Sequence, residues 1–377
     1  MKRYIIISMV FLSTSCLIFA TPAPDQLGPY AVGVTTMRME DPARLDPETQ
    51  QPRPLMVEVW YPTTHLGTQG RKNTLNDFFL GGGHPEFSKA MALAFQSDLE
   101  AVNKTFKTIS YRDAPVFEGL FPLVLFSHGN GGMRSQNVFW CEHLASHGYI
   151  VVAPDHTTNC LTTGLAGEII FFSDSKEARA QAAKDRPLDL IFILDEMDKI
   201  NRGADSRFRG RIDMELIAAA GHSFGGYTVA AAADLEPRID AIIPMAAVGN
   251  DRSRYDSPVM ILMATEDDTI KEKGNVAMRK YYADSQGPCY LVEFLNAGHY
   301  SFTEMYQFNP KYGDGCGKGK RITDGTDLSY IGMEKAFHLI NGYTTAFLGR
   351  YIKGIRTYDA YLNTNHDPDE IQLKTGG

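Results

Sequence analysis

The chain has 377 residues, of which 44% are hydrophobic, so it is long enough to bury a substantial core. Its 37 Lys and Arg residues stand against 45 Asp and Glu residues, which gives a formal net charge of −8. This acidic balance argues against nucleic acid and anionic membranes as principal partners. Length alone suggests about two domains, but an α/β fold of this size can be a single one. We expect one domain over residues 21–377.

The first twenty residues have the pattern of a leader. Residues 2–3 are basic, residues 4–19 are largely apolar, and Ala20 is a small residue at the expected cleavage point. This pattern is typical of a secretory signal peptide. The apolar stretch is too short and too polar for a membrane span, and apolar residues follow Cys16 where a lipid-anchored protein has a polar tether. We expect residues 1–20 to be removed and the mature protein to be periplasmic or secreted, without a transmembrane span.

Export would place the cysteines in an oxidising compartment, where disulfides can form. Four of the five remain in the mature chain, namely Cys141, Cys160, Cys289 and Cys316. An even number in an oxidising compartment permits two disulfides with three possible pairings, and proximity along the chain favours Cys141 with Cys160 and Cys289 with Cys316. The alternative is four buried free thiols, because free cysteine often serves as a small core residue.

Strand-like runs of β-branched and other apolar residues recur along the chain. They fall at residues 30–37, 55–61, 122–127, 149–153, 216–221, 239–245, 258–264 and 289–295. Apolar residues at helical spacing mark residues 135–147, 226–234, 271–283 and 331–352. Alternation of strand and helix in the second half predicts an α/β fold, with a mainly parallel central sheet and helices on both faces. The first two runs have no helical stretch between them, so we expect an antiparallel N-terminal edge.

Residues 176–201 are also predicted to be helical, with a break or new start at Pro187, because proline cannot donate a hydrogen bond inside a helix. Two stretches have the character of insertions. Residues 66–119 are longer than a tight connection requires, and residues 312–326 are polar and rich in glycine. Long excursions of this kind serve as lids or binding loops, or they decorate the surface.

The most informative motif is GHSFGG at residues 221–226, which follows an apolar run and leads into a helical stretch. Strand, sharp turn and helix place a serine at the tip of the turn, where the residues two before and two after it must lack bulk. Gly221 and Gly225 fill those places. Ser223 is therefore the candidate nucleophile, and the amide of Phe224, at the positive end of the helix, is a candidate donor to a developing oxyanion.

A serine nucleophile needs a histidine that accepts its proton and an acid that fixes the histidine tautomer. The strand-like run at 258–264 ends in three consecutive carboxylates. We rank Asp268 first as the triad acid, Asp267 second and Glu266 third, because Asp268 begins the Asp-Thr-Ile turn that precedes helix-forming residues. The alternative is that all three carboxylates are exposed to solvent on a loop and have no catalytic role.

His299 is the candidate base. It lies in a loop directly after the final strand-like run, and it follows the serine and the acid in the chain order Ser, acid, His. The other histidines have simpler explanations. His338 lies within a helical stretch, His366 lies in the polar tail, and His156 follows an earlier strand beside an aspartate.

The glycine-rich loop at residues 126–132 follows the third strand-like run. Its glycines allow a backbone amide to face a substrate carbonyl oxygen, and we predict that the amide of Asn130 is the second oxyanion donor. A dinucleotide-binding turn is the opposing interpretation, but that pattern requires glycine where Arg134 stands. His128 is expected to bond neighbouring loops.

No cofactor and no metal are predicted. His143 and His147 lie four residues apart on one helical stretch, but the glutamate that zinc hydrolases place after the first histidine is absent. His147 is better explained by an interaction with the end of its helix. Residues 313–320 are not a phosphate-binding loop, because Arg321 stands where such a loop has Ser or Thr.

Together these motifs resemble the α/β-hydrolase superfamily, and within it the group of plasma-type platelet-activating-factor acetylhydrolases and bacterial predicted dienelactone hydrolases. The likeness covers about residues 30–351, and its specific parts are VEVWYP at 57–62, FSHG at 126–129 and GHSFGG at 221–226. The resemblance implies an α/β-hydrolase fold, a Ser223, Asp268 and His299 triad, and an oxyanion hole made by the amides of Asn130 and Phe224. Secreted polyester hydrolases and cutinases are similar around the serine. Dienelactone hydrolases carry a cysteine nucleophile, so Ser223 argues against that activity.

These motifs predict an exported serine carboxylic-ester hydrolase that works through an acyl-enzyme and prefers short acyl groups. Its partner is a small-molecule or lipid ester. Alternatives are a phospholipase A2-like hydrolase of platelet-activating factor or oxidised phospholipids, a polyester or cutinase-like hydrolase, an enzyme that transfers the acyl group to an alcohol, and a non-catalytic binding protein that keeps only the fold.

Overall fold

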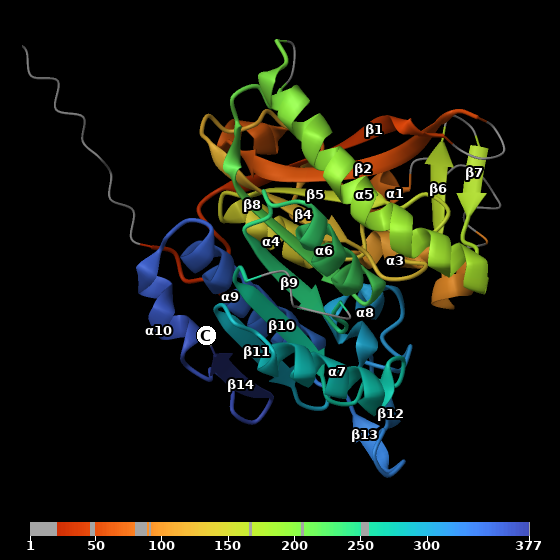
Figure 1. Ribbon diagram of the computed structural model, residues 1–377. Helices are drawn as coiled ribbons and strands as arrows, with labels where there is room; N and C mark the ends of the chain where they lie inside the picture. Colours follow the sequence, from red (N-terminus) through yellow and green to blue (C-terminus); the bar gives the residue numbers. More distant parts are fainter. Residues whose placement is uncertain are drawn as a thin grey trace, which may run out of the picture.

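A computed structural model describes residues 21–45, 50–79, 89, 92–165, 168–204, 207–249 and 256–376. The predicted leader lies outside these ranges. The centre of the molecule is a ten-stranded sheet in the order β14-β11-β10-β9-β8-β4-β5-β2-β1-β3 (Figure 1). Its strands are β1 Ala31–Leu45, β2 Pro52–Thr63, β3 Tyr111–Arg112, β4 Phe121–Ser127, β5 Ile150–Asp155, β8 Ile212–His222, β9 Ala241–Met245, β10 Val259–Ala264, β11 Cys289–Phe294 and β14 Ile371–Gly376.

The pairing of the strands confirms the predicted sheet. Strands β5, β4, β8, β9, β10 and β11 pair in parallel with one another in that order, and β2 pairs antiparallel with both β1 and β5. The antiparallel N-terminal edge is therefore confirmed. Strand β14 adds an antiparallel edge beside β11 that the sequence did not predict, because only Ile371 of this mostly polar strand is buried.

The central strands form because their side chains are apolar on both faces. Every residue of β4, with the sequence FPLVLFS, and of β10, with the sequence VMILMA, is buried. Parallel strands that are covered on both sides require such continuous apolar runs. The chain emerges from each of these strands at the same edge of the sheet, which is where the loops that carry polar residues gather.

Helices cover the two faces of the sheet. The long ones are α4 Val138–Ser146, α5 Lys176–Arg202, α6 Phe224–Leu235, α7 Lys271–Ala283 and α9 Met333–Tyr351. In Figure 1, α5, α6 and α7 lie in front of the sheet, and α4 and α9 lie behind it. Each face has its own apolar cluster: Trp140 and Phe347 belong to the rear cluster, and Leu194, Val229 and Met278 belong to the front one.

Helix α5 departs from the predicted break, because it runs unbroken through Pro187. Proline at this point removes one amide donor from the helix. The neighbouring side chains hold the segment in place: Arg186 and Asp189 are both fully buried and bonded to loops at the edge of the sheet. Tertiary contacts therefore override the local signal for a break.

Short elements complete the fold. They are η1 His65–Gln69, α1 Leu75–Phe78, α3 Leu99–Thr105, the hairpin of β6 Thr162–Leu165 and β7 Glu168–Phe171, η2 His299–Phe302, α8 Met305–Phe308, the hairpin of β12 Lys318–Lys320 and β13 Asp327–Ser329, η3 Arg356–Tyr358 and α10 Asp359–Leu362. Among the helices in the described ranges, none combines the length and apolar character needed to cross a bilayer.

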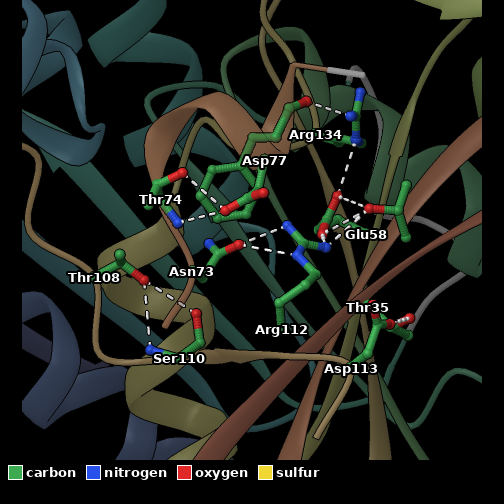
Figure 2. A network of polar contacts seen from close by, with 12 residues as sticks. Thr35, Glu58, Asn73, Thr74, Asp77, Thr108, Ser110, Arg112, Asp113 and Arg134 are labelled. Carbon is green, nitrogen blue, oxygen red and sulfur yellow. Dashed lines mark hydrogen bonds and ion pairs between the residues drawn. The ribbon is translucent and has the colours of Figure 1, made fainter. Parts of the chain in front are cut away.

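A buried charge network joins the N-terminal edge of the sheet to the insertion at 66–119 (Figure 2). The Glu58 carboxylate is fully buried and accepts hydrogen bonds from Arg112 Nη1 at 2.5 Å and from Arg134 Nε at 3.1 Å. Arg134 also pairs with Asp155, and Arg112 donates to the Asn73 side chain at 2.6 Å. Glu58 therefore pairs with Arg112 and shares Arg134 with Asp155.

Replacing Glu58 by alanine should lower the free energy of unfolding by about 3–5 kcal/mol, because removing one partner of a buried ion pair leaves uncompensated charge. Urea unfolding of the purified variant measures this change. The control is Glu40→Ala, which removes an exposed carboxylate paired with Arg38 and should leave stability almost unchanged. Equal stability of the two variants would contradict this role for Glu58.

Neither favoured disulfide is formed in the structure, in which all four cysteines are buried free thiols, the alternative expectation. Cys289 lies at the first position of β11. The loop that contains Cys316 lies near the last residues of that strand, because the Ser301 hydroxyl donates to the Gly315 carbonyl. Six residues of strand span roughly 20 Å, and a disulfide needs Cα atoms within about 7 Å. Cys141 packs in the apolar rear cluster, whereas Cys160 lies in a polar loop whose neighbours include Asp155. Nearness in sequence did not predict nearness in space.

We expect residues 21–377, unfolded in urea without reductant, to yield four titratable thiols per chain with a thiol reagent. The folded protein should react slowly, because burial hides all four sulfurs and raises the pKa of the Cys141 and Cys160 thiols. Absence of reactive thiols in the unfolded chain until reductant is added would restore the disulfide hypothesis.

Candidate active site

Ser223 lies at the turn between β8 and α6, as the motif predicted. Its backbone has φ 55° and ψ −120°, a strained conformation for a residue with a side chain. A Cβ on Gly221 would lie 2.3 Å from the Gly225 carbonyl oxygen, and one on Gly225 would lie 1.9 Å from the Ser127 carbonyl oxygen. Only glycine fits at either position. The turn is further fixed by a 2.7 Å bond from the Ser223 amide to the Met245 carbonyl.

Ser223 and His299 line the same cavity, which has a volume of about 120 Å³. Its walls are mostly apolar and come from the insertion at 66–119, the loops after β4 and β5, and the segment around α8. They include Phe95, Met133, Leu161, Met305 and Phe308. The rings of Phe95 and Phe308 stack with centroids 4.3 Å apart, so the first insertion packs against the site. The cavity is therefore a small apolar space with a serine and a histidine on its wall.

His299 follows β11, as expected, and is almost fully buried. Its Nδ1 atom lies 2.7 Å from Asp267 Oδ2. Since a carboxylate only accepts hydrogen bonds, Nδ1 carries the proton and Nε2 is left as the basic nitrogen. The His222 ring lies tilted against the His299 ring, with centroids 4.7 Å apart, and its Nε2 bonds the His299 backbone carbonyl at 2.9 Å. This bond holds the histidine loop against the turn that carries the serine.

The acid beside His299 is Asp267, so the first-ranked choice of Asp268 is corrected. Asp267 is fully buried, and its Oδ1 accepts the amides of Thr269 and Ile270 at 3.0 and 2.9 Å. Asp268 is exposed and donates its amide to Asp314. Glu266 pairs with Arg321 instead. An aspartate whose side chain accepts the amides two and three residues further on forms an Asx-type turn, and that signal pointed to Asp267.

The glycine-rich loop after β4 lies against the serine, because a Cβ on Gly129 would be 3.5 Å from the Ser223 Cβ. Three of the loop amides are already bonded: Gly129 to Gln136 Oε1, Gly131 to the Asn159 carbonyl, and Gly132 to the Gly129 carbonyl. Within the described ranges, the amides of Asn130 and Phe224 donate to no other protein group. Both predicted oxyanion donors are therefore free to bind a ligand.

The second insertion holds the acid loop and the histidine loop together through Asp314. Its Oδ1 atom accepts the amides of Asp268 and His299 at 3.0 and 2.9 Å, and its Oδ2 atom accepts the Thr269 hydroxyl at 2.6 Å. Asp314 has φ 39° between two glycines with positive φ. Asp314 was not among the predicted site residues, although an aspartate inside a glycine-rich turn is a frequent loop anchor.

Three further histidines, His128, His143 and His147, make structural contacts. His128 bonds neighbouring loops as expected: its Nε2 accepts the His156 amide at 3.1 Å. His143 and His147 bond the Pro24 and Gln26 carbonyls, so they fasten the N-terminal segment to α4, and burial lowers the pKa of His143 to about 3. Among the described residues, no three potential metal ligands come together.

Comparison with known proteins adds to this geometry. A family model described as PET hydrolase-like matches residues 119–313, just over half of the chain and the part that carries Asn130, Ser223, Asp267 and His299. The chain belongs to the PET hydrolase-like family. A second family model, described as platelet-activating factor acetylhydrolase isoform II, matches residues 19–184 of the chain. The resemblance to α/β-hydrolases of the acetylhydrolase type is confirmed.

Curated proteins similar to this PET hydrolase-like protein are named as acetylhydrolases and cutinases. Platelet-activating factor acetylhydrolase from Cavia porcellus is 25% identical over 66% of this chain and 62% of its own length, and that from Gallus gallus is 23% identical over 64% of each. The chain thus spans about three fifths of these relatives. Cutinase est1 from Thermobifida alba is 29% identical over 47% of this chain and 53% of its own length.

A solved structure supports the fold. A ferulic acid esterase from Streptomyces cinnamoneus superimposes with a TM-score of 0.69 and 23% identity, over 91% of this chain and 96% of the esterase. A match that covers nearly all of both chains confirms the α/β-hydrolase fold predicted for this member of the PET hydrolase-like family.

Proposed function

We propose that the protein is an exported serine hydrolase of carboxylic esters. The observation that carries the proposal is that Ser223, at a strained turn, shares one cavity wall with His299, whose Nδ1 is held by Asp267. These are the groups that acyl transfer requires, namely a nucleophile, a general base and an acid that fixes the tautomer of the base. Membership of a hydrolase family supports the same chemistry.

In the proposed reaction, Nε2 of His299 accepts the Ser223 proton as the hydroxyl oxygen attacks the ester carbonyl. Asp267 accepts a hydrogen bond from the Nδ1–H group of His299 and stabilises the imidazolium that forms, while the proton stays on Nδ1. The amides of Asn130 and Phe224 bind the oxyanion, His299 then protonates the leaving alcohol, and an acyl-enzyme remains on Ser223. Water, deprotonated by the same histidine, releases the acid.

Short acyl groups are the proposed substrates. The cavity volume of about 120 Å³ is small beside the roughly 300–1,000 Å³ of pockets that enclose a drug-sized ligand. An acetyl or butyryl group fits such a space, and the apolar walls favour an alkyl group over a charged one. The named relatives motivate two further substrate classes, phospholipids with a short acyl chain and polyesters.

Turnover of p-nitrophenyl esters from acetate to dodecanoate tests the proposal. We expect the highest kcat/KM for acetate to butyrate and a fall with each longer chain, because the cavity cannot enclose them. A preference for dodecanoate would contradict the proposed acyl length. No turnover of any ester by the folded protein would favour the binding-protein alternative, and ester products with added alcohol would indicate acyl transfer.

Export is part of the proposal because of the leader pattern at residues 1–20. Expression of the full chain in a Gram-negative host, followed by N-terminal sequencing of the periplasmic and medium fractions, tests it. Mature protein that begins near Thr21 is the expected result. Full-length protein that stays in the cytoplasm would contradict export.

A further inference from the structure

Arg186 is a buried cation next to the candidate oxyanion loop. The residue is fully buried in α5. Its Nη1 donates to the Asn159 side chain at 2.7 Å, and its Nη2 donates to Ser127 Oγ at 2.9 Å and to the His128 carbonyl. Among the described residues, no carboxylate forms an ion pair with it. Burial lowers the pKa of Arg186 to about 9, so the guanidinium remains charged at neutral pH.

The guanidinium also reaches the peptide unit that carries the candidate oxyanion donor. The Gly129 carbonyl and the Asn130 amide belong to one planar peptide, in which C=O and N–H point in opposite directions. Arg186 Nη1 lies 3.5 Å from the Gly129 oxygen, and His128 Nδ1 lies 2.6 Å from it. Because His128 Nε2 accepts an amide, its Nδ1 carries the proton and donates. These two side-chain donors, together with the Gly132 amide at 3.0 Å, hold the carbonyl on one side and turn the Asn130 N–H to the other.

Arg186 contacts the residue of the other candidate donor as well. Its guanidinium carbon lies 4.7 Å from the centre of the Phe224 ring, within the range of a cation–π interaction. One buried cation therefore touches both halves of the predicted oxyanion hole. Hydrogen bonds to a carbonyl also polarise the peptide and strengthen its N–H as a donor.

We propose that Arg186 is a positioning residue that sets the geometry of the oxyanion hole from behind, through the 129–130 peptide and the Phe224 ring. The inference rests on the proposed function. It goes beyond that function because the proposed reaction gives no role to Arg186, a fully buried cation that donates to backbone carbonyls. A purely structural role would affect folding without a specific effect on the oxyanion.

The test compares Arg186→Met and Arg186→Lys with Arg112→Lys, a matched change of a largely buried arginine in the Glu58 network. The readouts are kcat and KM for p-nitrophenyl acetate, the inhibition constant of an alkyl boronic acid that mimics the tetrahedral intermediate, and thermal unfolding. Loss of one oxyanion donor costs about 100- to 1,000-fold in kcat. We expect a loss of about 100-fold in kcat for Arg186→Met with KM changed less than about threefold, and a smaller loss for Arg186→Lys.

Boronate affinity should fall in parallel with kcat in both Arg186 variants, whereas Arg112→Lys should lower stability alone. If Arg186→Met does not fold, Arg186→Lys carries the test, because it keeps the charge and loses the planar donor set. Unchanged kcat and boronate affinity in folded Arg186→Lys and Arg186→Met would overturn the inference and leave the proposed function intact. Full activity of Ser223→Ala would overturn the proposed function itself, so the two failures are distinguishable.

Discussion

Replacing Ser223 by alanine should lower kcat for p-nitrophenyl acetate by about 10⁵- to 10⁶-fold, the loss seen when a serine nucleophile is removed from a triad. The substitution removes the hydroxyl that forms the acyl-enzyme and leaves the amides of Asn130 and Phe224 in place. The turn should persist, since its strain is held by the close approach of Gly221 and Gly225 and by the amide bond to Met245. Initial rates of the purified variant measure the loss of kcat, and its circular dichroism spectrum shows whether the fold is kept.

Ser146→Ala is the matched control. Ser146 is a buried serine at the end of α4 whose hydroxyl donates to the His143 carbonyl and accepts the Gly28 amide. It plays no part in the proposed reaction, so activity should remain while stability falls by about 1–3 kcal/mol for the two lost hydrogen bonds. A Ser223→Ala variant that keeps kcat within tenfold of the parent would exclude the proposed nucleophile.

The second large effect separates two adjacent carboxylates. Asp267→Asn should lower kcat by about 10⁴-fold, because an amide beside Nδ1 favours the wrong tautomer of His299 and does not stabilise its charge. The asparagine oxygen can still accept the amides of Thr269 and Ile270, so the turn is preserved. Thermal unfolding alongside kcat distinguishes a chemical loss from a folding defect.

Asp268→Asn is the matched control for that substitution, with the same change of charge one residue away. Its side chain is exposed, and only its backbone amide is bonded, to Asp314. We expect kcat within about threefold of the parent. A large loss in Asp268→Asn together with an active Asp267→Asn would reverse the assignment of the acid and require a different arrangement of the loop after β10.

Much of the fold was predictable from the sequence because local and tertiary preferences agree. The apolar runs of β4 and β10 can only be satisfied inside a covered parallel sheet. The two glycines around Ser223 predicted a close approach that the backbone then makes. Strand β14 escaped prediction because its pairing with β11 comes from the backbone and not from an apolar pattern.

The errors have a common physical origin in contacts between distant segments. Three consecutive carboxylates were available as the acid, and only the direction of each side chain from the turn distinguishes Asp267 from Asp268. The cysteine pairing failed because β11 separates Cys289 from the loop of Cys316. Arg186 and Asp314 were missed because their partners come from other segments of the chain: Ser127 is 59 residues from Arg186, and His299 lies in a separate loop 15 residues from Asp314.

The central claim is that Ser223 is the one residue that attacks an ester carbonyl. Intact mass and peptide mapping after treatment with a fluorophosphonate test it most directly, because such reagents modify a serine only when a base activates it. We predict one adduct per chain, on the peptide that contains residues 221–226, and no adduct in Ser223→Ala. An adduct on another residue, or an unmodified folded protein that still hydrolyses esters, would contradict the claim.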